Sequence, residues 1–201
     1  MKMEVKPVTL EGERVRLDPM TVAHLEPLIA AGAYEELWKW TNARADSREG
    51  MIQYVSAALA DHARGLCIPF VTVDKATERV IGSTRFGAID PPNTKVEIGW
   101  TWITPEFQRT YVNSEVKLLQ LTHAFETWGC TRVELKTDVL NEKSRNAMKR
   151  MGAVEEGVLR KHILTYSGRF RDSIYYSVLD TEWPAVKERL QGFVAGEAAT
   201  D

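Results

Sequence analysis

The first third of the chain places its apolar residues mainly at helical spacing. Met51, Ile52, Val55, Ala58 and Leu59 recur with a period of about 3.6 residues, which is the pattern of an amphipathic helix with one buried face. The elements expected in this part are a short strand at 14–17, a helix capped by Thr21, a helical piece at 34–40, and a longer helix that begins after Asp46 or Ser47 and ends before Gly65.

From Cys67 onward the apolar period changes to two, which is typical of strands. Turn residues, among them Pro91-Pro92-Asn93 and the helix stop Gly129, separate the elements. In chain order we expect strands at 67–73, 80–86 and 95–103, a helix at 113–128, a strand at 132–137, a helix at 142–151, extended stretches at 153–164 and 171–179, and a helix at 181–190. This order predicts an α/β (α+β) fold in which a mixed sheet carries helices on both faces.

No internal repeat, low-complexity tract or long Pro/Gly/Ser linker divides the chain. With 201 residues, of which 44% are hydrophobic, the chain can fill one substantial core. We therefore expect a single domain at 1–192, followed by a small, acidic and flexible tail at 193–201.

Charge, apolar runs and cysteine content limit the kinds of partner and the compartment that the sequence favours. The formal net charge of -2 provides no general attraction for nucleic acid or an anionic membrane, so neither is expected as a partner. No apolar run approaches the roughly 20 residues of a membrane span, and the N-terminus has no apolar signal core. Cys67 and Cys130 lie far apart and outside any CxxC or Cys/His cluster, so neither a disulfide framework nor a metal site is indicated. These features favour a cytoplasmic location.

The loop at 104–114 is the first candidate for chemistry. It is polar, contains Arg109 and leads into the helix expected at 113–128. Unpaired backbone amides and the helix dipole favour negative charge at such a terminus, and an arginine can add a bidentate contact, so the loop fits a pyrophosphate. A capped surface loop without a ligand fits the same sequence.

Several further motifs follow one another in a fixed order along the chain. They are Val96-Glu97-Ile98-Gly99-Trp100, Phe107-Gln108-Arg109, Glu115 with Ala124-Phe125-Glu126, Glu134-Leu135-Lys136-Thr137, Asn141-Glu142-Lys143-Ser144-Arg145-Asn146-Ala147, and Met151-Gly152-Ala153. Together they span nearly the whole domain and resemble the GNAT superfamily of acyltransferases, in particular the ribosomal-protein alanine N-acetyltransferase (RimJ/RimL) type. The resemblance implies a GNAT fold with a six- to seven-stranded sheet and a splayed central strand pair. It also implies acetyl-CoA as cosubstrate, without a metal.

The resemblance assigns residues to the cofactor. The pantetheine would lie where strand 95–103 splays from strand 132–137, bonded by the backbone of Trp102 and Ile103, which would also polarise the thioester carbonyl. The side chains of Trp100 and Trp102 are expected to pack on one face of their strand. The other residues implied for the cofactor are Gln108, Arg109, Thr110, Tyr111, Val112, Asn113, Ser114, Asn141 and Asn146. Tyr111 stands where the family usually has glycine, so the phosphates must follow another backbone path here.

Three residues are candidates for proton transfer. By the resemblance, Ser144 lies near the sulfur and protonates the departing thiolate, while Asn141 beside it can equally be a helix cap. Glu97 is the first candidate for the base that takes the proton of the amine, and His162 is the second. Glu97 could instead be an exposed strand residue paired with a lysine, and His162 a surface histidine.

The acceptor is less well defined by the sequence. A protein N-terminal amine, with a pKa of about 7.7–8.0, is neutral more often than a lysine at about 10.4, and direct transfer in a ternary complex needs no covalent enzyme intermediate. Two alternatives stay open: an acetyltransferase for a small amine such as an antibiotic, polyamine or amino acid, and a non-catalytic acyl-CoA-binding module. The cluster Tyr34, Leu37, Trp38 and Trp40 fits either core packing or a wall of the acceptor cleft. An exposed sheet edge would suit a homodimer.

Overall fold

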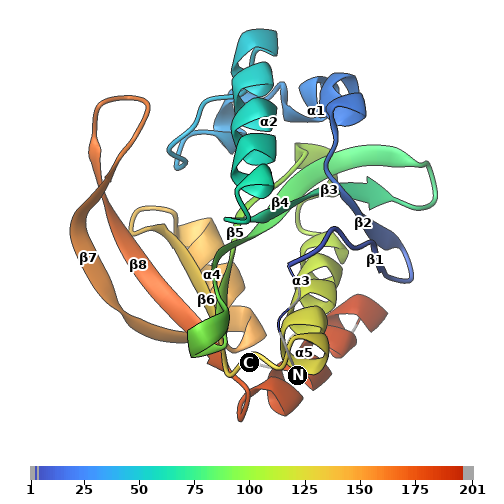
Figure 1. Ribbon diagram of the computed structural model, residues 1–201, viewed down its shortest axis with the longest axis vertical. Coiled ribbons are helices and arrows are strands. Elements are labelled where there is room, and N and C mark those ends of the chain that lie inside the picture. Colours follow the sequence, from blue (N-terminus) through green and yellow to red (C-terminus); the bar gives the residue numbers. More distant parts are fainter. Residues whose placement is uncertain (1–2, 4, 197–201) are drawn as a thin grey trace.

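The computed structural model describes residues 3 and 5–196, which form one central sheet between two layers of helices (Figure 1). Eight strands lie in the order β1-β2-β3-β4-β5-β6-β8-β7. All neighbours are antiparallel except β5 and β6, which are parallel. The mixed sheet with helices on both faces is confirmed, but it has eight strands rather than six to seven. The additional strand, β1, has two residues, too few to show an alternating pattern.

The strands span β1 Leu10–Glu11, β2 Val15–Pro19, β3 Ile68–Asp74, β4 Arg79–Asp90, β5 Lys95–Ile103, β6 Arg132–Asp138, β7 Val154–Leu164 and β8 Phe170–Leu179. The main helices are α1 Leu25–Gly32, α2 Arg48–Ala63, α3 Val112–Thr122, α4 Glu142–Met151 and α5 Trp183–Ala195.

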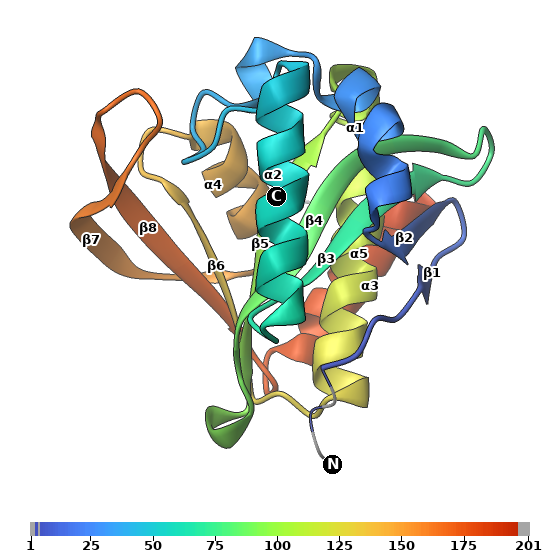
Figure 2. The ribbon, with the colours of Figure 1, turned by 45° about the horizontal axis from the view of Figure 1, so that its top comes forward.

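Each face of the sheet has its own buried cluster of side chains. Helices α1 and α2 cover one face, where Leu28 and Met51 pack with Val71; α3, α4 and α5 cover the other, where Leu121 and Leu135 are buried. Figure 2 shows α2 in front of the strands, with α3 and α5 behind them. All residues of β3 are buried, because both of its faces are covered.

Capping residues set the ends of two helices as the sequence predicts. Ser47 Oγ accepts a hydrogen bond from the Gly50 amide at 3.1 Å, so α2 begins after Ser47 rather than Asp46. Asn141 caps α4 and Gly152, with a φ of 100°, ends it. Only glycine adopts that backbone conformation readily, and α4 therefore has the expected bounds.

Two expected helices differ from the structure because tertiary contacts override the local pattern. The piece at 34–40 is reduced to the 3-10 turn Glu35–Leu37, and the indole of the following Trp38 donates a hydrogen bond back to the Gly32 carbonyl oxygen at 2.9 Å. The helix at 113–128 becomes α3 followed by the π-helical turn His123–Thr127.

The C-terminal helix is longer than the sequence predicts. Helix α5 continues to Ala195, so the first residues of the tail expected at 193–201 are helical. Phe193 packs against the core and the Arg150 guanidinium lies 4.7 Å from its ring centroid, which stabilises the extra turn. Residues 197–201, the rest of the predicted tail, lie outside the described residues.

Within the part of the chain that the structure describes, no helix is long and apolar enough to cross a bilayer. The same residues contain no group of three or more His, Cys, Asp or Glu side chains that could hold a metal ion. Cys67 and Cys130 are free thiols in the interior, where burial raises the pKa of both.

Candidate active site

The sheet opens between its two parallel strands. Residues Lys95–Glu97 of β5 pair with Arg132–Glu134 of β6; beyond this point β5 continues to Ile103 along β4, while β6 continues to Asp138 along β8. The inner edges of β5 and β6 therefore face each other without pairing, which confirms the splayed central pair. We call this opening the wedge.

The backbone of β5 directs specific polar groups into the wedge. The Thr104 amide donates to the Ile81 carbonyl of β4 at 2.8 Å, and alternate residues of a strand direct their amides to opposite edges. The N–H and C=O of Ile103 therefore face the wedge, and those of Trp102 face β4. The Ile103 carbonyl accepts a hydrogen bond from Gln108 Nε2 at 2.7 Å. This geometry favours the Ile103 amide over that of Trp102 as a donor to a ligand in the wedge.

A β-bulge shapes β5 just before Ile103. The register with β4 shifts between Ser83 and Arg85, and Trp100 has a φ of 52°, a left-handed conformation that is uncommon for a bulky residue. The two tryptophans consequently differ in environment. Trp102 is buried against Trp38 and Tyr54, whereas Trp100 is 38% exposed.

The loop before α3 presents backbone amides at a helix N-terminus. The Glu115 amide donates to the Tyr111 carbonyl oxygen at 2.9 Å, so α3 begins its hydrogen-bond ladder there. The amides of Asn113 and Ser114, in the first turn, precede that ladder and have no intrahelical acceptor. The Val112 amide donates to Thr110 Oγ1 at 3.3 Å. With the exposed Arg109 beside it, this terminus can hold an anionic group.

Tyr111 does not distort the loop although it stands where the family usually has glycine. Its φ and ψ of -61° and -21° lie in the right-handed region, which any residue adopts. Its side chain leaves the loop: the Arg14 guanidinium lies 3.6 Å from the ring centroid, and the hydroxyl is 3.5 Å from Asp74 Oδ1. The left-handed position of this loop is Arg109, with a φ of 61°.

A lysine that the sequence analysis did not assign connects the two sides of the wedge. Lys143, in the first turn of α4, donates a hydrogen bond to Gln108 Oε1, and Gln108 in turn bonds to Ile103. Its position two residues after the predicted cap Asn141 was the available signal, because a cation in the first turn of a helix that borders a phosphate site can contact the phosphate.

Asn141 and Ser144 lie at the end of β6, where α4 begins. The Asn141 side chain accepts a hydrogen bond from the Ser144 amide at 3.2 Å, so its structural role as a cap is confirmed. The Ser144 hydroxyl is partly exposed and makes no hydrogen bond to the residues that the structure describes. Asn146, further along α4, has an exposed side chain.

The two candidate bases belong to one polar cluster on the face of the sheet that α2 also covers. Glu97 is 3% exposed and its Oε2 accepts a hydrogen bond from Lys136 Nζ at 2.6 Å, so it is a buried ion-pair partner rather than an exposed strand residue. His162 is exposed, with its ring 5.8 Å from that of Tyr175. Partial loss of hydration, and then the positive charges of Lys136 and Arg171, lower the pKa of His162, which favours the neutral imidazole.

The members of the early aromatic cluster differ in burial. Trp38 is 1% exposed and packs on Tyr54 and Trp102, with ring centroids 5.5 and 5.3 Å apart. Trp40 instead faces the β7–β8 hairpin: its carbonyl oxygen accepts a hydrogen bond from Arg171 at 3.4 Å. Core packing is thus confirmed for Trp38, and the wall of an acceptor cleft stays a prediction.

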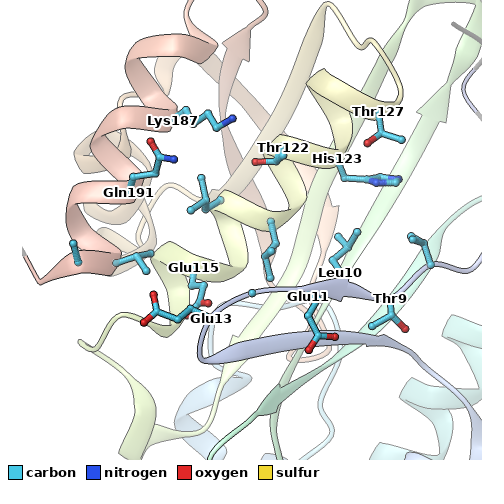
Figure 3. Close-up of a pocket in the computed structure, with 16 residues that line it drawn as sticks. Thr9, Leu10, Glu11, Glu13, Glu115, Thr122, His123, Thr127, Lys187 and Gln191 are labelled. Atoms are coloured by element: carbon cyan, nitrogen blue, oxygen red, sulfur yellow. The ribbon is translucent and has the colours of Figure 1, made fainter.

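A cavity of about 840 Å³ lies elsewhere, between residues 8–13, α3 and α5. Figure 3 shows that Glu11, Glu13 and Glu115 contribute to its lining. Lys187 also lines it but is paired with Glu126. An acidic lining is unsuited to a pyrophosphate, so the cavity is not a candidate for the cofactor site.

The wedge between β5 and β6, the loop before α3 and the polar cluster around Glu97 together indicate the class of protein. The family model described as an acetyltransferase (GNAT) domain matches residues 14–154. The chain belongs to this family of GNAT acetyltransferases, which use acetyl-CoA as the acyl donor.

Relatives and solved structures agree with this class. A Bacillus subtilis protein provisionally named ribosomal N-acetyltransferase YdaF is 37% identical over 99 residues, which are 49% of this chain and 53% of that protein; the match thus spans about half the length of YdaF. A GCN5-related N-acetyltransferase from Brucella melitensis is 30% identical over 94% of this chain and 86% of its own, with a TM-score of 0.87. Mycobacterium smegmatis RimJ in complex with CoA-disulfide shares the fold, with a TM-score of 0.80 over 98% and 99% of the chains and 20% identity.

Proposed function

We propose that this protein transfers the acetyl group of acetyl-CoA to a free α-amino group at the N-terminus of a protein or peptide. The observation that supports the proposal is the wedge: the Ile103 amide faces it without a strand partner, and β5 leads directly into the loop before the N-terminus of α3. The ribosomal name of YdaF supports a protein acceptor. An α-amine is also favoured chemically, because it is neutral at physiological pH more often than a lysine side chain.

The residues around the wedge fit each part of acetyl-CoA: its phosphates, its pantetheine and its thioester. The amides of Asn113 and Ser114, with Arg109 and Lys143, would hold the phosphates. The unpaired edges of β5 and β6 would bond the pantetheine amides, and the Ile103 N–H would donate to the thioester oxygen as negative charge develops there. Bound acetyl-CoA supplies the activated acyl group.

The proposed transfer is direct. The neutral amine attacks the thioester carbon, the new C–N bond forms and the C–S bond breaks. The amine proton passes to His162, which is unprotonated at neutral pH, while Glu97 remains paired with Lys136. The Ser144 hydroxyl donates a proton to the departing thiolate and regains one from solvent, to which His162 releases the proton it has taken.

Thiol release and product mass test the proposal. The purified protein is incubated with acetyl-CoA and three acceptor sets: peptides with a free α-amine, the same peptides with a blocked α-amine and one lysine, and small amines. Turnover of the first set, with one acetyl group on the N-terminal residue, is expected. Turnover of small amines alone would show a small-molecule acetyltransferase, and saturable acetyl-CoA binding without any turnover would show a binding module.

A further inference from the structure

A cavity separate from the wedge lies between residues 8–13, α3 and α5 (Figure 3). Its volume is about 840 Å³, and none of its described lining residues belongs to β5, β6, β7 or β8. On each helix the lining side chains recur at helical spacing, with Glu115, Leu118, Leu119 and Thr122 on α3 and Lys187, Gln191 and Val194 on α5. The stripe on α3 is about 10 Å long, so the cavity can hold an extended chain of several carbon atoms.

One end of the cavity contains a buried carboxylate. Glu115 is 2% exposed, and its Oε1 accepts a hydrogen bond from the Arg14 amide at 2.9 Å. Its Oε2 is buried as well and has no hydrogen-bond partner among the residues that the structure describes. Since a buried carboxylate oxygen without a donor is energetically costly, this end of the cavity favours a ligand that donates a hydrogen bond.

Most other ionisable side chains of the lining are already paired or neutral. Glu11 is paired with Lys75 at 2.9 Å, and Lys187 is paired with Glu126 at 2.7 Å. Burial lowers the pKa of His123, which favours its neutral form. The described lining therefore supplies no free positive charge for the buried carboxylate.

The guanidinium of Arg14 does not complete the charge balance at this end. It lies 3.6 Å from the Tyr111 ring centroid and donates a hydrogen bond to the Val194 carbonyl oxygen, and in the described chain it forms no ion pair with Glu115. Glu13, which also lines the cavity, is exposed and has no ion-pair partner in the same part of the chain. Two carboxylates thus accompany one cation, and the excess charge at this end is negative.

Glu115 is also next to the proposed phosphate site. It lies in the first turn of α3, directly after Asn113 and Ser114, whose amides have no intrahelical acceptor. A buried negative charge at this place repels an anion at the same helix terminus. A cation bound to Glu115 would remove this repulsion, so the two ligands would strengthen each other's binding.

We propose that this cavity binds an organic cation with a primary ammonium group and an apolar chain, and that this ligand strengthens the binding of CoA. The ammonium group would donate to Glu115 Oε2 and balance the excess negative charge, while the chain would lie against Leu118 and Leu119. The inference goes beyond the proposed function, and only its second half rests on the phosphate site proposed there.

Calorimetry with hexylamine, 1-hexanol and hexanoate tests the site, because the three probes share one chain length and differ in charge. Hexylamine, which is protonated at pH 7.5 as a lysine is, should bind roughly tenfold more tightly than 1-hexanol, and hexanoate should not bind. CoA replaces acetyl-CoA in the coupling measurement, so that the amine cannot be acetylated. Saturating hexylamine should lower the Kd for CoA roughly three- to tenfold at low salt.

Glu115→Gln removes the charge but keeps an oxygen for the Arg14 amide. This variant should bind hexylamine and 1-hexanol about equally, and its Kd for CoA without amine should already be as low as that of the amine-loaded wild type. Glu188→Gln, exposed on α5 and outside the lining, is the matched control and should behave like the wild type. If Glu115→Gln does not fold, Glu13→Gln decides, and it should weaken hexylamine binding roughly threefold without affecting that of 1-hexanol.

Equal affinity of the wild type for hexylamine and 1-hexanol overturns the inference, as does an unchanged preference in folded Glu115→Gln or, if that variant is unfolded, in Glu13→Gln. A Kd for CoA that does not respond to hexylamine overturns the coupling. Hexylamine binding that appears only in Lys2→Gln would assign the cavity to Lys2 of the chain itself and likewise overturn the proposal. Peptide acetylation is assayed without hexylamine, so that a failure of the proposed function is recognised separately.

Discussion

Lys117 lies in the interior between α3 and the sheet, and the effect of its burial on the pH dependence of stability can be measured. It is 7% exposed, and its Nζ donates to Thr101 Oγ1 of β5 at 3.0 Å. Burial alone lowers the pKa of Lys117 from 10.5 to about 7. Between these values the unfolded chain binds a proton that the folded chain does not, so folding stability rises with pH in this range. Lys117→Met removes the titrating group and should remove that rise.

The expected magnitude follows from the two pKa values. Their difference, 10.5 − 7, is about 3.5 pH units, which corresponds to about 5 kcal/mol for a fully developed effect. From pH 7.5 to 9.5 the wild type should gain about 3 kcal/mol of unfolding free energy relative to Lys117→Met. At pH 7 and below, where the buried amine becomes charged, the methionine variant should be the more stable protein.

Urea unfolding at pH 7.5, 8.5 and 9.5 measures this difference for both proteins. Lys39→Met is the control, because Lys39 is exposed and its replacement should leave the slope with pH unchanged. Parallel stability curves for the wild type and Lys117→Met would refute the argument, since Lys117 would then titrate alike in the folded and unfolded chains.

Three further substitutions test the site. Tyr111→Gly should lower the unfolding free energy by about 2 kcal/mol, because the ring packs beneath Arg14, yet change the Kd for acetyl-CoA less than about threefold; a tenfold tighter Kd measured by calorimetry would mean that the loop needs glycine. Asn141→Ala should cost about 1 kcal/mol in thermal unfolding through the lost cap, and Asn141→Asp should restore it; equal melting of all three proteins would contradict the cap. For the wild type, kcat/KM should rise with pH through an apparent pKa below that of an ordinary histidine, because only the neutral imidazole accepts a proton. His162→Ala should lose this lower limb and keep only the rise at a pH of about 7.7–8.0 that the α-amine of the free acceptor contributes; persistence of the lower limb would transfer the role of base to Glu97.

Turn and capping residues next to single elements predict a substantial part of the fold. Strand β5 and helix α4 have the bounds expected from the sequence, because strong stop signals flank them. The turn Pro91–Asn93 precedes β5, and Gly152, which follows α4, has a φ of 100°. Order and type of the larger elements follow from the change of apolar period near Cys67.

Other features depend on contacts between distant segments, which no local pattern contains. The bulge at Trp100 results from the pairing of β5 with β4. The direction of the Tyr111 ring is set by Arg14, which is far from it in the sequence. The ion pair of Glu97 with Lys136 arises where β5 and β6 meet.

The short pairing between β5 and β6 also has a mechanical consequence. Within the described chain, the three pairs from Lys95–Arg132 to Glu97–Glu134 are the whole of the strand pairing that joins the β1–β5 half of the sheet to the β6–β8 half. Among the strands from β2 to β8 this seam has the fewest strand pairs, and a cosubstrate bonded to both of its edges, as proposed above, would add hydrogen bonds where the two strands do not pair. Binding of the donor would then also hold the two halves of the sheet together and make the loaded protein more rigid.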